Sequence, residues 1–273
     1  MLNTETKLFA ILGYPVKHSF SPQMQNKWFE KENLNCVYLA FEPKSNNLKK
    51  TIKSLKLLRF EGLNITIPYK IEVMKYVDFT DKAAKKIGSI NTIVVKNNKL
   101  YGYNTDYLGF SQDLTAKKIN LKSKNVLVIG AGGGARAIIY ALKNSNAKDV
   151  YIANRTLKNA QQLAKVFKVK IVDIGKVEEL LPEIDLFINT SACGMKKTDT
   201  LPFKVDKVKS SLIIYDLIYN KETPFTKLAK DRNLKLFTGE GMLIYQGACG
   251  FKMWTGKYPN TKIAEKLLKK FTI

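Results

Sequence analysis

A short apolar run that ends in a cluster of glycines constrains the fold of this chain more than any other feature. Residues 126–129 are all apolar, and Gly130-Ala131-Gly132-Gly133-Gly134-Ala135 follows at once. A buried strand that turns through glycines into a helix opens a βαβ unit, so the feature predicts a parallel sheet covered by helices. Gly130 permits the tight turn, Gly132 lets a ligand approach the backbone, and Ala135 allows close packing of helix and strand.

The helix that follows these glycines offers free N–H groups and a partial positive charge to an anionic ligand. The spacing Gly130-x-Gly132-x-x-Ala135, between a strand and a helix, matches the fingerprint of a dinucleotide-binding turn. We therefore expect the pyrophosphate of a dinucleotide to bind at Gly130, Ala131, Gly132, Gly133 and Gly134.

The end of the next strand candidate predicts which dinucleotide binds. An NAD site places Asp or Glu there, to hydrogen-bond the ribose 2′-hydroxyl. This chain has Asn154-Arg155-Thr156 instead, with Lys158 close behind. A guanidinium pairs with a 2′-phosphate, which a carboxylate would repel. These residues favour NADP (NADPH) as the cofactor. The alternative interpretation is that Arg155 is an exposed residue of an ordinary loop and contacts no cofactor.

Strand and helix candidates alternate from one end of the chain to the other, which is typical of α/β proteins. Those before the glycine turn are Lys7–Gly13, Cys36–Phe41, Gly62–Ile67 and a hairpin of Asn91–Val95 with Leu100–Tyr103. Those from the turn onward are Val126–Ile129, Val150–Ala153, Lys170–Asp173, Asp185–Asn189 and Leu212–Asp216. Ser21 and Pro22 predict the N-cap and first residue of a helix. Two final helix candidates, Gly241–Thr255 and Thr261–Phe271, have no strand after them.

This alternation predicts two α/β lobes around a cleft. Residues 106–240 would form a Rossmann-like NADP-binding domain. Residues 1–105 together with 241–273 would form the substrate-binding and catalytic domain, an α/β domain completed by the C-terminal helices.

The chain is strongly basic, with a net charge of +23 from 46 Lys and Arg against 23 Asp and Glu. Arginine makes most bidentate contacts to bases, yet only Arg59, Arg136, Arg155 and Arg232 occur. The lysines are scattered, without the interleaved aromatic residues of a nucleic-acid surface. We therefore expect no nucleic-acid partner; the positive field would instead attract an anionic substrate and cofactor.

The number and spacing of the cysteine, histidine and apolar residues argue against a metal-binding, membrane-spanning or secreted protein. Cys36, Cys193 and Cys249 lie far apart and only one histidine occurs, so no metal site is expected. No apolar run reaches the roughly 18 residues that span a bilayer. The first residues lack the charged and then apolar pattern of a signal peptide. We expect a cytoplasmic protein without a membrane partner.

Two further segments carry side chains suited to acid–base chemistry. Lys70 stands just past Pro68, which ends the strand candidate 62–67, and Asp106 follows Asn104-Thr105 at the end of the hairpin. Ligand sites of α/β proteins form at such strand ends. A proton donor, a carboxylate that anchors hydroxyls and a hydride-carrying cofactor are the parts needed to reduce the ketone of a polyhydroxylated acid. The alternatives are a solvated lysine and a helix-capping aspartate.

The order and spacing of many motifs resemble the shikimate dehydrogenase family over nearly the whole chain. The matching segments are His18–Pro22, Asn64–Lys70, Gly88–Thr92, Asn104–Asp106, the glycine turn, Asn154–Thr156, Asn189–Ser191 with Gly194-Met195, Asp216–Tyr219, Gly239–Leu243 with Gln246-Gly247, and Phe251–Gly256. Asn159 departs from the family, which often has a second arginine at that position, and Lys158 could stand in for it.

The resemblance implies reversible NADPH-dependent reduction of 3-dehydroshikimate to shikimate, a step toward chorismate and the aromatic amino acids. It implies that Lys70 transfers the proton, while Asp106 hydrogen-bonds substrate hydroxyls and orients Lys70. Ser19 and Ser21 would bind the substrate carboxylate, with Tyr219 close by. Thr66, Asn91 and Gln246 would contact substrate hydroxyls. The implied cofactor contacts beyond the turn are Asn154, Arg155, Thr156, Leu217 and Gly239.

Other functions stay open at this point. A quinate/shikimate dehydrogenase using NAD usually carries an acidic residue where Arg155 stands, which argues against it. A paralogue acting on an aminated shikimate would differ by one or two contacts. A non-catalytic binding protein of the same fold would be expected to lack Lys70 or Asp106. The sequence allows a monomer or a homodimer.

Overall fold

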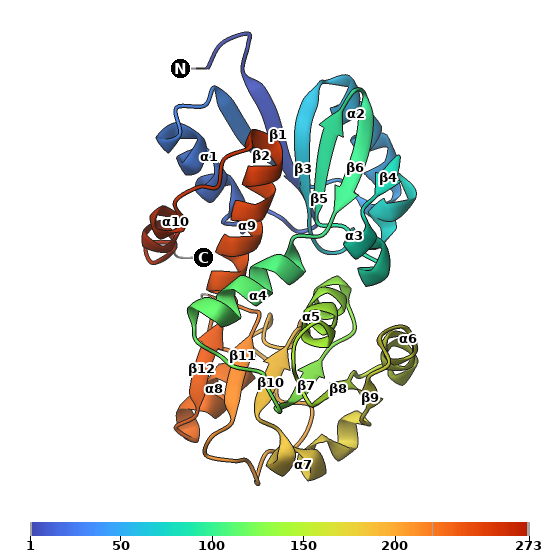
Figure 1. Ribbon diagram of the computed structural model, residues 1–273, viewed down its shortest axis with the longest axis vertical. Helices are drawn as coiled ribbons and strands as arrows, with labels where there is room; N and C mark the ends of the chain where they lie inside the picture. Colours follow the sequence, from blue (N-terminus) through green and yellow to red (C-terminus); the bar gives the residue numbers. More distant parts are fainter. Residues whose placement is uncertain (1, 220, 272–273) are drawn as a thin grey trace. The chain divides into compact units, whose positions relative to one another are not determined.

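A computed structural model describes residues 2–219 and 221–271 (Figure 1). The chain divides into two compact units, which are described separately. Unit 1 comprises residues 1–110 and 243–273, and unit 2 comprises residues 111–242. Each unit holds one six-stranded sheet with helices packed against it. The predicted fold class, with two α/β units, is therefore confirmed.

The sheet of unit 1 has the strand order β2-β1-β3-β5-β6-β4. Strands β2, β1 and β3 are parallel, whereas β5 is antiparallel to both β3 and β6. As a result, the C-terminal ends of β3 and β6 and the N-terminal end of β5 lie at the same edge. The strands are β1 (Lys7–Leu12), β2 (Cys36–Phe41), β3 (Phe60–Ile65), β4 (Phe79–Thr80), β5 (Thr92–Lys96) and β6 (Lys99–Tyr103).

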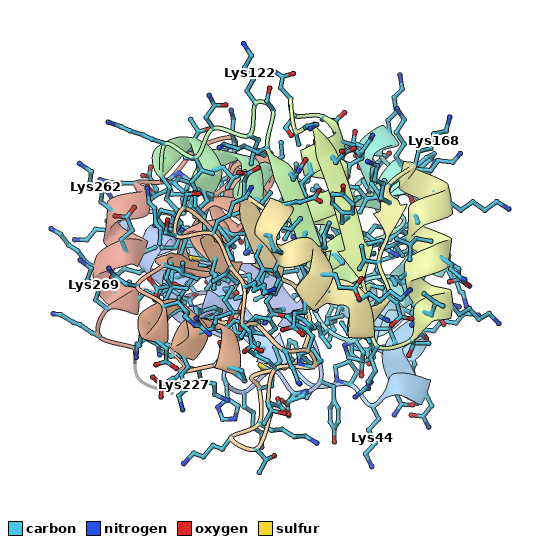
Figure 2. All side chains as sticks on the ribbon, turned by 90° about the horizontal axis from the view of Figure 1, so that it is seen from below. Lys44, Lys122, Lys168, Lys227, Lys262 and Lys269 are labelled. Atoms are coloured by element: carbon cyan, nitrogen blue, oxygen red, sulfur yellow. The ribbon has the colours of Figure 1, made fainter. Side chains whose placement is uncertain are left out.

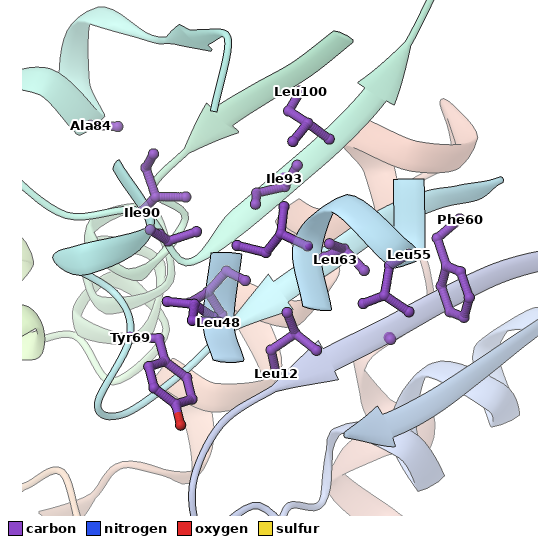
Figure 3. Close-up of a cluster of buried hydrophobic side chains, with 14 residues drawn as sticks. Leu12, Leu48, Leu55, Phe60, Leu63, Tyr69, Ala84, Ile90, Ile93 and Leu100 are labelled. Atoms are coloured by element: carbon purple, nitrogen blue, oxygen red, sulfur yellow. The ribbon is translucent and has the colours of Figure 1, made fainter. Parts of the chain in front are cut away.

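The helices of unit 1 bury both faces of this sheet. On one face, α2 places Leu48, Ile52 and Leu55, which lie on one side of the helix, against the strands. Figure 3 shows this cluster, in which side chains of α2 meet Leu12 and Leu63. The helices are α1 (Ser21–Lys31), α2 (Leu48–Leu57), α3 (Lys82–Ile87), the start of α4 (Asp106–Ala116), most of α9 (Glu240–Thr255), and α10 (Thr261–Leu268).

The two C-terminal helices return to unit 1 and complete its core. Trp28 of α1 meets Phe251 of α9 with ring centroids 5.8 Å apart, and the Trp28 indole donates to the Asn260 carbonyl at 3.1 Å. Trp254 packs against Phe9 of β1 at 5.2 Å. Large buried aromatic rings supply much of the stabilising apolar area of such a layer.

Unit 2 holds a fully parallel sheet with the order β12-β11-β10-β7-β8-β9. Read from β7, this is the doubly wound order 3-2-1-4-5-6, which places ligands where the order reverses, between β7 and β10. The strands are β7 (Asn125–Ile129), β8 (Asp149–Ala153), β9 (Lys170–Ile171), β10 (Leu186–Asn189), β11 (Ile213–Asp216) and β12 (Lys235–Thr238). The helices wholly within it are α5 (Gly133–Lys143), α6 (Leu157–Phe167), α7 (Val177–Leu180) and α8 (Pro224–Asp231).

The structure differs from the sequence prediction at the start of one helix and in three short strands. Ser21 is the first residue of α1 rather than its cap, because Phe20 occupies the cap position and already has helical dihedral angles. Strand β9 is shorter than predicted, and neither β4 nor β12 was predicted. All three are short strands at sheet edges, where local patterning is weak.

Within residues 2–219 and 221–271, no helix combines the length and apolar character needed to cross a membrane. Figure 2 shows labelled lysines projecting outward from different elements, among them Lys122, Lys168 and Lys227 of unit 2. Those three lysines are exposed and dispersed rather than gathered on one helix or strand.

Candidate functional site

Four polar side chains from different segments meet at one edge of the unit 1 sheet. Lys70 follows β3, Asn91 directly precedes β5, Asp106 opens α4 after β6, and Gln246 comes from α9. The antiparallel orientation of β5 brings its first residues to the same edge as the ends of β3 and β6. We call these four residues the Lys70 cluster.

The main chain fixes where these side chains start. The Lys70 carbonyl accepts a hydrogen bond from the Ile90 N–H at 2.8 Å, and the Asn91 N–H donates to the Tyr103 carbonyl at 3.0 Å. The side chain of Asn104 caps the start of α4 by accepting from the Asp106 N–H at 3.0 Å. Asp106 is therefore the first residue of its helix and keeps its carboxylate for other contacts.

The Asp106 carboxylate is bound on both oxygens. Lys70 Nζ donates to Oδ2 at 2.7 Å, and Asn91 Nδ2 donates to Oδ1 at 2.9 Å. Asn91 Nδ2 also lies 3.1 Å from Gln246 Oε1. The Lys70 side chain is 16% exposed and that of Asp106 is 5% exposed. The ion pair is therefore shielded from most water but still open to a ligand at the lysine.

This arrangement suits acid–base chemistry on a hydroxylated ligand. A lysine held by a carboxylate is an oriented proton donor, and its ammonium carries protons not used by Asp106. Asn91 and Gln246 present neutral amide groups that can read hydroxyls by hydrogen bonds. The sequence prediction that Lys70 and Asp106 act together thus has a geometric basis in a direct contact.

Other predicted substrate residues lie in the loops after β1 and β3. The Thr66 N–H donates to the Leu12 carbonyl at 2.9 Å, which joins these two loops at the strand ends. Ser19 Oγ accepts from the Ser21 N–H at 3.2 Å, and Ser21 is buried. Tyr219 belongs to unit 2, in the segment after β11. Ligand contacts of Ser19, Ser21, Thr66 and Tyr219 stay predictions.

Unit 2 carries the glycine turn between β7 and α5. Gly130 has φ of +111°, a conformation that favours glycine, and its N–H donates to the Ala153 carbonyl at 2.9 Å. Gly132 is the N-cap of α5, and a Cβ built there would meet no atom within 4 Å. Open space beside the backbone at a helix N-terminus is what a bound pyrophosphate requires. The turn therefore fits the dinucleotide that the sequence predicts.

The loop after β10 supports this turn from the other side of the reversal point. Thr190 Oγ1 donates to the Ile129 carbonyl at 2.7 Å, so the ends of β7 and β10 are joined. Asn189 Nδ2 donates to Asp216 Oδ1 at 2.9 Å, and the Ile218 N–H donates to the same oxygen at 3.0 Å. Burial raises the pKa of the Asp216 carboxyl, although these hydrogen bonds and one from Thr223 oppose that shift.

The remaining predicted cofactor residues line the ends of β8, β11 and β12. Asn154 Nδ2 donates to the Thr156 carbonyl at 2.9 Å and shapes the loop in which Arg155 is exposed. Lys158 is exposed in the first turn of α6. Gly239 lies so close to Leu217 that an added Cβ would overlap the Leu217 main chain. Arg155 and Lys158 are thus free to meet an anion at the end of β8.

Comparisons with known proteins agree with this geometry. A family model described as the shikimate dehydrogenase substrate binding domain matches residues 11–93. Models described as shikimate/quinate 5-dehydrogenase and as the shikimate 5′-dehydrogenase C-terminal domain match residues 113–213 and 239–269. The NADP(+) shikimate dehydrogenase of Aquifex aeolicus (strain VF5) is 40% identical over 269 residues, which cover 98% of each chain. The chain belongs to the shikimate dehydrogenase family.

Solved structures of family members share the fold of this chain. The shikimate dehydrogenase from Aquifex aeolicus matches with a TM-score of 0.94 and 39% identity, covering 98% of this chain and 100% of that one. The enzyme from Thermus thermophilus, crystallised with NADP(H) and shikimate, matches with a TM-score of 0.88 and 33% identity, covering 97% and 99%. The resemblance predicted from sequence motifs is therefore confirmed as family membership.

Four polar residues behind the Lys70 cluster were assigned no role from the sequence, although three of them lie in segments that match the family. Tyr38, Asn64, Thr92 and Thr105 form a buried hydrogen-bonded group that continues from Asn91 into the sheet. Each is a polar residue next to or within an apolar strand, which is the signal that could have marked it. Their connection depends on strand register, which the sequence does not display.

Two glycine substitutions in the turn should separate folding from binding. A Cβ at Gly130 would lie 2.6 Å from Thr190 Oγ1 at an unfavourable φ, so Gly130→Ala should cost roughly 1–3 kcal/mol of unfolding free energy. Gly132→Ala should cost less, since its Cβ meets open space, yet should weaken NADP binding several-fold by filling the approach to the backbone. Denaturant unfolding and calorimetric titration with NADP would check both. Equal stability losses would contradict this account.

Proposed function

We propose that the chain catalyses the reversible NADPH-dependent reduction of 3-dehydroshikimate to shikimate. The observation that carries this proposal is the ion pair of Lys70 with Asp106, held at 2.7 Å at the edge of the sheet beside two amide side chains. Relatives that share the fold of both units carry the name of this activity. The reaction belongs to chorismate and aromatic amino acid biosynthesis, and we expect a monomer or homodimer acting in the cytoplasm.

In the proposed reaction, Lys70 moves the proton. Lys70 Nζ donates its proton to the ketone oxygen of 3-dehydroshikimate as a hydride reaches the carbonyl carbon, so the C=O bond becomes a CH–OH group. The neutral amine then takes a proton from solvent. In the reverse direction Lys70 accepts the hydroxyl proton. Asp106 keeps Nζ in place through its Oδ2 contact and offers its carboxylate to a neighbouring substrate hydroxyl.

The neutral side chains around this pair position the ring. Asn91, Gln246 and Thr66 hydrogen-bond the hydroxyls, and a substrate lacking one of them would leave a buried polar group unpaired. Ser19 and Ser21 hold the carboxylate near the start of α1, where the helix dipole favours a negative charge. Tyr219 is the further substrate-binding residue that we propose in unit 2.

NADP, when bound, supplies the hydride to this reaction. The glycine turn, Gly130 to Gly134, holds its pyrophosphate, and Arg155 with Lys158 holds the 2′-phosphate. Asn154 and Thr156 shape that loop. Leu217 and Gly239, which lie so close together that a Cβ on Gly239 would overlap the Leu217 main chain, are the remaining cofactor residues.

An absorbance assay at 340 nm tests this proposal. Shikimate or quinate is combined with NADP or NAD in all four pairs, using the purified chain. We expect fast cofactor reduction with shikimate and NADP, and much slower reduction in the other three mixtures. Comparable rates with quinate and NAD would replace the proposal with a broader dehydrogenase. No reaction in any mixture would favour an aminated substrate or a binding protein.

A further inference from the structure

We propose that Tyr38 is a positioning residue for the Lys70 cluster, acting through a one-directional chain of hydrogen bonds over Asn64, Thr92 and Asn91. The inference rests on the proposed function and extends its machinery to a residue on the edge strand β2. Tyr38 is two strands away from Asn64 in the sheet order, since β1 lies between β2 and β3. Among the described residues, the Tyr38 hydroxyl bonds Asn64, whereas Lys70 bonds Asp106.

The chain begins at a tyrosine hydroxyl with a fixed partner. Tyr38 is 1% exposed, and its hydroxyl donates to Asn64 Oδ1 at 2.6 Å. Asn64 Oδ1 is an acceptor only, so the tyrosine must be the donor. Burial raises the pKa of Tyr38 well above its ordinary value, which keeps this hydroxyl protonated.

The same contact sets which way the Asn64 amide faces. With Oδ1 on Tyr38, Asn64 Nδ2 donates to the Asn91 carbonyl at 3.1 Å and to Thr92 Oγ1 at 3.2 Å. The Thr92 hydroxyl then gives its own proton to Asn91 Oδ1 at 3.0 Å. Asn91 Nδ2 in turn donates to Asp106 Oδ1 at 2.9 Å. Every bond points the same way, and the series ends on the carboxylate that holds Lys70.

Hydrogen bonds arranged in series polarise one another, and a buried donor or acceptor left unpaired is costly. If Tyr38 lost its hydroxyl, Asn64 Oδ1 would lose its donor. Turning the amide over would place Oδ1 against the Asn91 carbonyl, which is also an acceptor. It would also draw the Thr92 proton away from Asn91. Either outcome weakens the support of Asn91 and Asp106.

The surroundings hold Tyr38 in the position this role needs. Asn26 of α1 clamps its main chain, because Asn26 Oδ1 accepts from the Tyr38 N–H at 2.8 Å and Nδ2 donates to its carbonyl at 2.9 Å. The Trp254 ring lies 6.1 Å from the Tyr38 ring and anchors itself on the Ile93 carbonyl. Contacts with α1, with α9 and with the sheet therefore hold the Tyr38 hydroxyl in position.

Hydrogen bonds from Thr105 also hold Asn91, and they limit the loss of activity that we expect when Tyr38 is replaced. The Thr105 N–H donates to Asn91 Oδ1 at 2.6 Å, and the Thr105 hydroxyl lies 3.1 Å from the same oxygen, so Asn91 keeps its contacts with Thr105 when the chain is cut. We therefore expect Tyr38→Phe to lower kcat/KM for shikimate by roughly three- to tenfold, the effect of losing about one hydrogen bond. The KM for NADP should stay unchanged, because the cofactor residues belong to unit 2.

The test compares Tyr38→Phe, Thr92→Val and their double variant, with steady-state kinetics and thermal unfolding for each. If both residues act through one chain, the double variant should lose no more activity than the less active single variant. Thr92→Ser keeps the hydroxyl and should restore activity that Thr92→Val loses. Tyr76→Phe is the matched control, because Tyr76 bonds Glu72 and lies outside the chain.

Each outcome decides the inference. Activity of Tyr38→Phe within twofold of wild type, or losses that multiply in the double variant, would overturn it. A lowered unfolding temperature with unchanged kcat/KM would assign Tyr38 to stability alone and overturn the positioning role. If Tyr38→Phe did not fold, equal activity of Thr92→Ser and Thr92→Val would overturn the chain. A wild-type protein inactive on shikimate would instead overturn the proposed function, and this inference with it.

Discussion

Replacing Lys70 with alanine should lower kcat for shikimate oxidation by roughly 100- to 10,000-fold, the range that a positioned acid–base group contributes. The variant removes the amine that lies 2.7 Å from Asp106 Oδ2, so water must take the hydroxyl proton without orientation. Asn91, Asp106 and Gln246 remain to hold the hydroxyls, so the KM for shikimate should change little. Cofactor absorbance at saturating NADP would measure both constants.

Two companion variants make the Lys70 result specific. Lys70→Gln can still donate a hydrogen bond to Asp106 but has no proton to exchange, so it should be as slow as Lys70→Ala. Lys75→Ala removes an exposed lysine five residues along the chain and should keep the wild-type rate. Near-wild-type turnover of Lys70→Gln in a folded protein would show that another group moves the proton.

Replacing Arg155 with aspartate should shift the cofactor preference from NADP toward NAD. Arg155 is exposed just past the end of β8, where the ribose of a bound dinucleotide lies in doubly wound folds. The variant removes a guanidinium from the 2′-phosphate, repels that phosphate and offers a carboxylate to the 2′-hydroxyl of NAD. The ratio of kcat/KM for NADP to that for NAD should fall by roughly 10- to 100-fold, as expected for loss of a charged hydrogen bond.

A charge-matched control separates this effect from the basic field of the whole protein. Arg232→Asp makes the same change in net charge at an exposed position at the end of α8. It should weaken binding of both cofactors slightly and leave their ratio unchanged. An unchanged ratio in Arg155→Asp would place the 2′-phosphate contact elsewhere, with Lys158 as the next residue to replace.

The sequence predicted the parts of the fold that short-range chemistry determines. The apolar run before Gly130 forms a strand, and open space lies beside the Gly132 backbone, both as predicted. Each of these features depends mainly on neighbouring residues. The hairpin 92–103 follows from its polar turn, where Asn97 and Asn98 take positive φ values of 50° and 56°. Such features can be predicted because each is settled within a few residues.

Features that depend on the rest of the fold were harder to predict. The prediction of Ser21 as a cap is wrong because the sequence does not show that Phe20 already has helical dihedral angles. The hydrogen bonds from Tyr38 to Asn91 join residues of β2, β3 and β5, and their existence depends on the register of the sheet. The pairing of Lys70 with Asp106, 36 residues apart, was expected only through the family resemblance.

The most direct test of the central claim is to follow the hydride itself. The purified chain is mixed with 3-dehydroshikimate and NADPH carrying deuterium at the transferred position of C4, and the product is analysed by mass spectrometry and NMR. We predict shikimate with one deuterium bound to the carbon that carried the ketone, formed by the wild type and far more slowly by Lys70→Gln. Failure to form shikimate, or shikimate without deuterium at that carbon, would contradict the account.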